Sequence, residues 1–185
     1  MNNPNPNPNA DNNPQTAPRY IPPLHPDWRF LFSHPAHFIA LGAGSGMSRL
    51  APGTVGTVWA WAAFGVLQSW FSSAQIGWII GITAIVSIWA GMRTAQHLQV
   101  ADPGSIVIDE IVAFWLILWL ITPTTFWGQF GAFVLFRYFD AAKPGPVGWA
   151  DRAFKGFGWK GGFGILLDDL VAAFCVLVVF AVVRF

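Results

Sequence analysis

Two pairs of adjacent acids, Asp109-Glu110 and Asp168-Asp169, interrupt strongly apolar runs of the sequence. A charged carboxylate at the centre of a membrane helix costs about 2.5–3.5 kcal/mol even on lenient insertion scales. Successive helical residues are about 100° apart, so at least one acid of each pair can face a bundle interior. Contact with water at the ends of helices would explain isolated acids there. It would not explain two pairs of adjacent acids within apolar runs. We therefore expect a functional metal or proton site here.

Further acids fall near the same ends of the apolar runs. The whole set is Asp102, Asp109, Glu110, Asp140, Asp151, Asp168 and Asp169. Converging carboxylates without enough cations repel one another, and a divalent cation removes that conflict. Oxygen ligands suit magnesium, calcium or manganese, and magnesium combines a few carboxylates with water and substrate phosphate. Zinc hydrolysis is poorly supported, because there is no HExxH and no histidine lies inside an expected span. We expect His34 and His37 to be interfacial or capping residues.

Two further blocks carry polar residues. The stretch GAGSGMSRLAPGTVGT, which includes Arg49, leads into an apolar run. Its glycines would let N–H groups converge on a phosphate at a helix N-terminus, or they would allow close helix packing. In FRYFDAAKPGP, Arg137, Asp140 and Lys143 follow at intervals of three, so they lie near one face of a helix end that Pro144 stops. An ion-paired helix terminus is the alternative interpretation. The chemistry left open is metal-assisted attack by water or a covalent aspartate nucleophile.

Composition indicates an integral membrane protein. The chain has 185 residues, of which 54% are hydrophobic and 10% charged, with eleven Trp and seventeen Phe. An average soluble domain has roughly 25% charged residues. The net charge of +1 gives no reason to expect a nucleic-acid partner.

Five apolar stretches predict an all-α, polytopic helical bundle with about five spans, four being the alternative. A span needs about 20 apolar residues. The stretches are Thr54–Phe71, Ile76–Met92, Ile106–Thr122, Phe126–Phe139 and Ile165–Val183, of which the fourth is short. Residues 1–27 are predicted to be a disordered Asn/Pro-rich tail without the features of a signal peptide. Residues 28–185 are then the membrane-embedded domain.

The positive charges predict the orientation. If the chain forms two hairpins and a final span, all Lys and Arg except Arg184 share one face of the membrane. They are Arg19, Arg29, Arg49, Arg93, Arg137, Lys143, Arg152, Lys155 and Lys160. Cytoplasmic loops are enriched in Lys and Arg, so we expect this face and the N-terminus to be cytoplasmic.

Four blocks in order resemble the bacterial phosphatidylglycerophosphatase A family. They are GAGSGMSRLAPGTVGT, DPGSIVIDEIVAF, FRYFDAAKPGPVGWADR and GGFGILLDDLVAA, within about residues 35 to 173. The resemblance implies a Mg²⁺-dependent phosphatase of the bacterial inner membrane. Such an enzyme removes the terminal phosphate of phosphatidylglycerophosphate to give phosphatidylglycerol in phospholipid synthesis. The implied partners are this substrate and membrane lipids, and the oligomeric state is open.

The resemblance also implies roles for the matching residues. Expected Mg²⁺ ligands are Asp109, Glu110, Asp168, Asp169, Asp102 and Asp151. Asp140 is expected as a further ligand or general base, and Asp109 and Lys143 join it as catalytic residues. Expected contacts to the substrate phosphate are Ser45, Ser48, Arg49, Thr54, Arg137, Lys143 and Arg152. One departure from the family is the insertion AFKGFGWK at 153–160, which leaves open where Asp151 and Arg152 lie relative to the last acid pair.

Two alternatives belong to other classes of protein. In a small ion- or proton-coupled transporter the acids would form a relay, although acids at the ends of spans suit this less than acids near the midplane. A non-catalytic membrane scaffold is the third interpretation.

Overall fold

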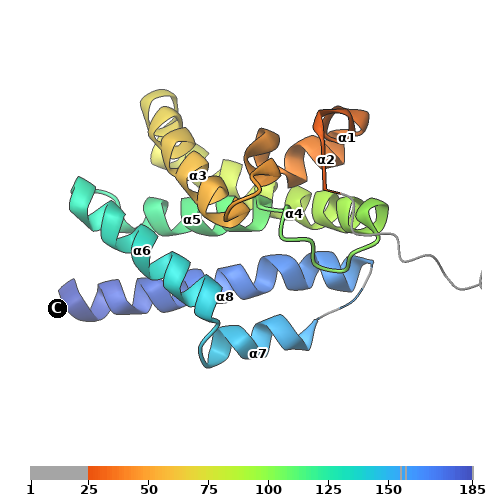
Figure 1. The fold of residues 1–185 in the computed structure, drawn as a ribbon. Helices are drawn as coiled ribbons and strands as arrows, with labels where there is room; N and C mark the ends of the chain where they lie inside the picture. Colours follow the sequence, from red (N-terminus) through yellow and green to blue (C-terminus); the bar gives the residue numbers. More distant parts are fainter. Residues whose placement is uncertain (1–24, 155, 157, 185) are drawn as a thin grey trace, which may run out of the picture.

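A computed structural model describes residues 25–184 except 155 and 157, and Figure 1 shows helices joined by short links. The helices are α1 (Trp28–Ser33), α2 (Pro35–Ala40), the 3-10 helix η1 (Gly42–Met47), α3 (Pro52–Trp70), α4 (Ser73–Leu98), α5 (Ile108–Ile121), α6 (Phe126–Ala142), α7 (Pro146–Ala153) and α8 (Trp159–Arg184). No strand occurs among the described residues, so the all-α prediction is confirmed. The predicted disordered tail lies outside them as far as residue 24.

Helix α5 forms the centre of the bundle, and it packs against α3, α4, α6 and α8. Most of its side chains are buried, because the helix is apolar on nearly every side. Trp115 of α5 donates a hydrogen bond from Nε1 to the carbonyl oxygen of Ala60 at 2.8 Å, and Phe114 stacks on Phe136 of α6. This packing fixes the first turn of α5, which carries Asp109 and Glu110, inside the bundle.

Side-chain caps fix where α4 and α6 begin. Ser72 precedes α4 and forms a capping box with Gln75. Thr125 precedes α6, and its side chain accepts a hydrogen bond from the backbone N–H of Gly128. Helix α6 ends at Ala142, and Lys143 follows in the left-handed conformation with φ of 44°.

Two of the described helices are long and apolar enough to cross a membrane, Ser73–Leu98 and Trp159–Val183. This is fewer than the five spans predicted. Helices α5 and α6 have 14 and 17 residues, which is short of the length that a full span needs. Helix α3 has 19 residues, but its Gly, Thr, Gln and Ser residues lower its mean hydropathy.

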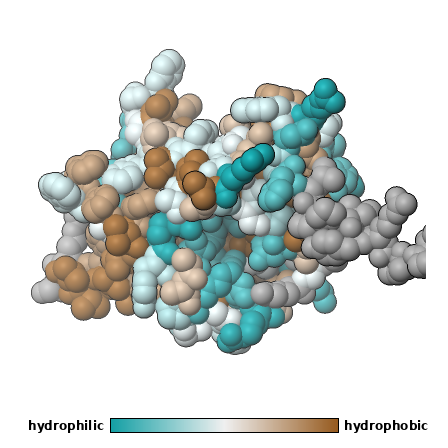
Figure 2. Space-filling model, viewed as in Figure 1, coloured by the Kyte–Doolittle hydropathy of each residue, from teal (hydrophilic) through white to brown (hydrophobic). Residues whose placement is uncertain are grey.

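Exposed tryptophans gather towards two opposite ends of the bundle. Trp70, Trp78 and Trp127 lie near the ends of α3, α4 and α6 that are remote from the acids, and Trp28, Trp149 and Trp159 lie on or beside the acid-bearing ends. Two aromatic belts of this kind are typical of proteins that cross a bilayer. Figure 2 shows apolar residues over α6 and the C-terminal half of α8, with polar residues in the middle and to the right.

Three of the four histidines, His34, His37 and His97, lie at the contact of α2 with α4. His34 caps α2, since its Nδ1 accepts the backbone N–H of Ala36 at 3.0 Å, as predicted. His37 is buried rather than interfacial, and its Nε2 lies 2.7 Å from Nδ1 of His97. Burial lowers the pKa of His37 below its ordinary value. Helix α4 continues to Leu98 instead of Met92, so His97 lies in its last turn, beyond the predicted apolar stretch.

Candidate active site

Arg137 joins α6 to the first turn of α5. Its Nη1 donates hydrogen bonds to Glu110 Oε1 at 3.1 Å and to Asp140 Oδ2 at 2.6 Å. The Arg137 side chain is 20% exposed and each of the two carboxylate side chains 13%. Such charge-assisted bonds are strong when they are shielded from water. The predicted common face of Arg137 and Asp140 is confirmed, and Arg137 fixes both carboxylates.

Lys143 joins the end of α6 to α7 and α8. Its Nζ donates to Asp151 Oδ1 at 2.5 Å and to Asp168 Oδ2 at 2.6 Å. Burial alone would lower the pKa of Lys143, but the hydrogen bonds to the two carboxylates outweigh it, so the pKa is raised and the ammonium stays charged. Lys143 does not share the helical face of Arg137 as predicted, because its own backbone is left-handed and directs its side chain elsewhere.

The acids between these two ion-pair groups are buried and incompletely bonded. Asp109 Oδ1, Glu110 Oε2 and Asp169 Oδ2 have no hydrogen-bond partner among the described residues. Asp169 of α8 lies close enough to Asp109 and Glu110 of α5 and to Asp140 of α6 for their like charges to repel one another. A buried carboxylate oxygen without a partner is costly. This arrangement requires protons or a cation.

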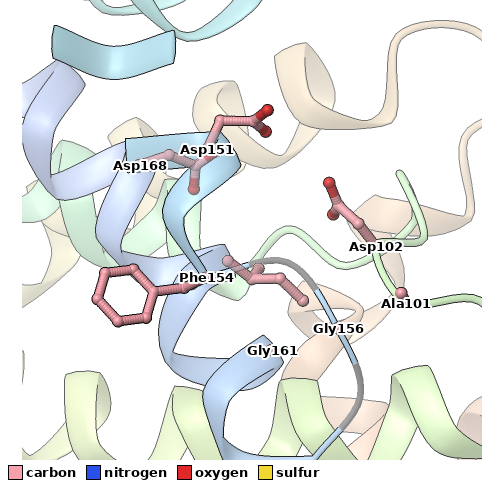
Figure 3. Close-up of a pocket in the computed structure, with 9 residues that line it drawn as sticks. Ala101, Asp102, Asp151, Phe154, Gly156, Gly161 and Asp168 are labelled. Atoms are coloured by element: carbon pink, nitrogen blue, oxygen red, sulfur yellow. The ribbon is translucent and has the colours of Figure 1, made fainter. Parts of the chain in front are cut away.

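A small cavity adjoins the Lys143 group. Its volume is about 50 Å³, and Asp102, Asp151 and Asp168 border it together with Phe154 and Gly161. Figure 3 shows these three acids on separate segments around it: the loop after α4, helix α7 and helix α8. The cavity is large enough for water molecules or an ion.

A larger cavity of about 440 Å³ opens beside the glycine-rich segment. Ser48 and Arg49 border it on one side, and Asp102 and Ser105 border it on the other. Its volume falls in the range of small-molecule sites. Asp102 borders both cavities, so the two lie next to each other.

The glycines of this segment serve close packing. Gly46 lies against the carbonyl oxygen of Ser105, Gly56 against Val107, and Gly53 against the carboxylate of Glu110. The packing interpretation is therefore confirmed for these three glycines.

The polar side chains of the glycine-rich segment are placed as follows. The hydroxyl of Ser45 donates to the carbonyl oxygen of Gly42, and that of Ser48 donates to the carbonyl oxygen of Leu50. Thr54 is half-buried in the first turn of α3, and Arg49 is exposed. A phosphate-binding role for the four predicted residues remains a prediction.

The insertion at 153–160 does not separate the last acids from α7. Asp151 shares the Lys143 ammonium with Asp168, although α7 ends at Ala153 and α8 begins at Trp159. Arg152, next to Asp151, is exposed on α7.

The carboxylate oxygens of the site are ligands that suit magnesium, although they are not arranged as a complete metal site. Among the residues that the structure describes, no three His, Cys, Asp or Glu side chains are arranged to hold a metal ion. Seven carboxylates nevertheless gather around the ion pairs of Arg137 and Lys143, and three of their oxygens are unbonded. Magnesium takes carboxylate oxygens together with several waters. The residues therefore fit this ion in chemistry.

Two contacts of the site region were missed by sequence reasoning. The approach of Gly53 to Glu110 and the pairing of His37 with His97 join segments about 60 residues apart. Neither spacing nor composition signals them. The sequence indicated that the glycine-rich segment matters, but it did not indicate which residues its glycines contact.

A helical membrane-associated protein with a buried carboxylate centre is the class that this fold and site define. The family model described as phosphatidylglycerophosphatase A matches residues 38–184. The chain belongs to the phosphatidylglycerophosphatase A family, and it is a phosphatase.

Three relatives match most of their own length. Phosphatidylglycerophosphatase A of Escherichia coli is 35% identical over 161 residues, which are 82% of this chain and 87% of the relative. The Haemophilus influenzae protein of the same name is 35% identical over 151 residues, 80% of this chain and 89% of the relative. A Bacteroides thetaiotaomicron protein with the provisional name phosphatidylinositol-3-phosphatase is 32% identical over 151 residues, 79% and 91% of the two chains. No solved structure matches the chain.

Proposed function

We propose that this phosphatase hydrolyses the terminal phosphomonoester of phosphatidylglycerophosphate, giving phosphatidylglycerol and inorganic phosphate. The names of two relatives, both phosphatidylglycerophosphatase A, support this substrate. The observation that carries the proposal is the buried centre of Asp109, Glu110 and Asp169, whose unbonded oxygens lie beside the ion pairs of Arg137 and Lys143. The relatives do not favour a transporter.

The headgroup of the substrate enters through the larger cavity. Arg49 and Ser48 border that cavity, and Asp102 connects it with the smaller one. Arg49 and the exposed Arg152 attract the anionic headgroup, since surface cations raise the local concentration of an anion. The terminal phosphate then lies between Lys143 and Arg137, where Arg can bind two oxygens and Lys acts as a point charge.

Magnesium is the cofactor in this proposal, with Asp109, Glu110 and Asp169 as its principal ligands. Asp168, Asp102 and Asp151 would complete the candidate set, and two of these, Asp168 and Asp151, are held by Lys143. When bound, Mg²⁺ supplies positive charge against the phosphate oxygens and makes water more acidic.

The chain's own residues divide the remaining work. Asp140, held by Arg137 at 2.6 Å, accepts a proton from water as the water oxygen attacks phosphorus. The bond from phosphorus to the glycerol oxygen breaks, and that oxygen takes up a proton from solvent water. Lys143 and Arg137 offset the charge that develops on the phosphate oxygens. Arg137 also keeps Glu110 in place through its second hydrogen bond.

The enzyme lies in the bacterial inner membrane, with the active site and the N-terminus on the cytoplasmic side. The shared face of nine Lys and Arg supports this orientation. Helices α4 and α8 cross the bilayer, and α3, α5 and α6 are embedded beside them as shorter helices. Helix α7, with exposed Trp149, lies at the cytoplasmic surface.

One assay tests the reaction and the ion together. The purified protein in detergent is mixed with phosphatidylglycerophosphate, with Mg²⁺ or with a chelator, and released phosphate is measured. Release that needs Mg²⁺ is expected. No release under either condition, with ion flux after reconstitution in liposomes, would mean that the transporter interpretation is right.

A further inference from the structure

An open groove is lined by residues of α3 and α6. In Figure 1, α3 rises above α5 and α6 passes below it. The groove has a volume of about 370 Å³. Its lining residues are Val58, Trp61, Ala62, Gly65, Gln68, Phe126 and Gln129.

The floor of the groove is apolar and well fixed. The ring of Trp61 stacks on Phe126 at 5.4 Å and on Phe133 at 5.9 Å between centroids. Its Nε1 donates to Oε1 of Gln129 at 2.6 Å, so the polar atom of the indole is satisfied. The surface offered to an occupant is therefore largely aromatic and aliphatic.

Small residues keep the groove open on the side of α3. A Cβ atom added at Gly65 would meet no other atom within 4 Å, and Ala62, one turn earlier, is exposed. A larger residue at either position would fill the groove instead of packing against the protein.

The groove begins near the acids and leads away from them. On α3 it extends from Val58 to Gln68, which is about 15 Å at a rise of 1.5 Å per residue. Gly53, which touches Glu110, precedes Val58 by only about 7.5 Å along the same helix. The length equals one leaflet of the hydrocarbon core, about half of 30 Å.

We propose that this groove binds one acyl chain of the lipid substrate while the phosphate lies at the acids. The inference rests on the proposed function and adds a subsite for the substrate's tail. Three observations select an acyl chain as the occupant: the apolar floor, the length of one leaflet, and the short distance from its start to Glu110. The subsite makes the enzyme prefer long-chain lipids over water-soluble phosphomonoesters with the same headgroup.

The test compares Gly65→Leu with Gly81→Leu in detergent solution. Gly81 is a matched control, because it also lies on an exposed helix surface with no atom within 4 Å of an added Cβ, but it lies on α4, outside the groove. Each variant is assayed with dioleoyl and with dihexanoyl phosphatidylglycerophosphate. The ratio of kcat/KM for the long chain to that for the short chain should fall about tenfold in Gly65→Leu, the effect of losing contact with about two methylene groups. It should stay at the wild-type value in Gly81→Leu.

Equal ratios in Gly65→Leu and the wild type would overturn the subsite. A change of oligomeric state in Gly65→Leu, measured by size-exclusion chromatography with light scattering, would also overturn it and assign the groove to a second copy of the chain. If the wild type releases no phosphate from either lipid, the proposed function fails. Native mass spectrometry then tests separately whether the groove binds an acyl chain. Long-chain lipid should stay bound to the wild type and to Gly81→Leu but should be lost from Gly65→Leu.

Discussion

Gly53, in the first turn of α3, lies directly against the carboxylate of Glu110 on α5, so that a methyl group at Gly53 would occupy the place of the carboxylate. The atoms in the way are the far end of a flexible side chain, which can turn aside. We expect Gly53→Ala to keep its fold and to lower kcat by about tenfold, since a displacement near 1 Å in an active site can cost even more. Phosphate release and thermal unfolding are measured on the same preparation.

Gly56→Ala is the control for this substitution. A Cβ at Gly56 would lie 2.8 Å from Cβ of Val107, which is a stiff, β-branched residue that cannot move aside. Its cost therefore falls on stability, at about 1–3 kcal/mol. If Gly53→Ala lowered the melting temperature as Gly56→Ala does while kcat stayed normal, the contact with Glu110 would be merely structural.

Lys143 should be needed for turnover because it bridges Asp151 and Asp168 beside the small cavity. We expect Lys143→Met to lower kcat roughly 100-fold, the order of effect of removing one charge-stabilising donor from an active site. Lys160→Met is the matched control, since Lys160 is exposed in the first turn of α8. Equal kcat values for the two variants would show that Lys143 only stabilises the contact between α6, α7 and α8.

Asp169 should couple metal binding to stability. Its Oδ2 is buried without a partner, and it repels Asp109 and its neighbours. We therefore expect Asp169→Asn to unfold at a higher temperature than the wild type when Mg²⁺ is absent. Added Mg²⁺ should stabilise the wild type in proportion to ln(1 + [Mg²⁺]/Kd), and this stabilisation should be lost in Asp169→Asn.

Thermal unfolding at several Mg²⁺ concentrations measures both effects, and K⁺ at matched ionic strength is the control. If Mg²⁺ raised the melting temperature of both proteins equally, Asp169 would not be a Mg²⁺ ligand. The proposed reaction would not be contradicted by that result.

His37 should make stability depend on pH. Its pKa is lowered in the folded state by burial, whereas in the unfolded chain it has the ordinary value of about 6.5. The unfolded state therefore binds more protons below this pH, and stability is lost as the pH falls through 6.5. We expect the melting temperature to drop less between pH 7.5 and 5.5 in His37→Gln than in the wild type. If the melting temperature of His37→Gln dropped as much as that of the wild type, a group other than His37 would be responsible for the pH dependence.

Local spacing made part of the site predictable. Arg137 and Asp140 pair because residues three apart share a helical face, and the acid pairs were conspicuous because they interrupt apolar runs. Lys143 obeyed the same spacing but turned to Asp151 and Asp168, since its left-handed backbone lies beyond the helix end. Sequence spacing could not reveal that turn.

The bounds of the helices were less predictable, because tertiary packing sets them. Helix α8 begins six residues before the predicted Ile165, although GGFG resembles a loop. Those glycines allow close approach: Gly162 lies against the carbonyl oxygen of Ile88 on α4, and Gly164 against Phe154. Two of the five predicted spans, those of α4 and α8, are found, whereas α5 and α6 are apolar but too short to be full spans.

The short length of α5 has a consequence for the surrounding lipid. Its 14 residues extend about 21 Å, whereas the hydrocarbon core is about 30 Å thick. Hydrophobic mismatch of this kind is relieved by local thinning of the bilayer. In the proposed orientation, water and headgroups would then reach Asp109 and Glu110, so the substrate phosphate could stay hydrated while the acyl chains stay in the hydrocarbon. We therefore expect the rate of phosphate release to depend on the thickness of the host membrane.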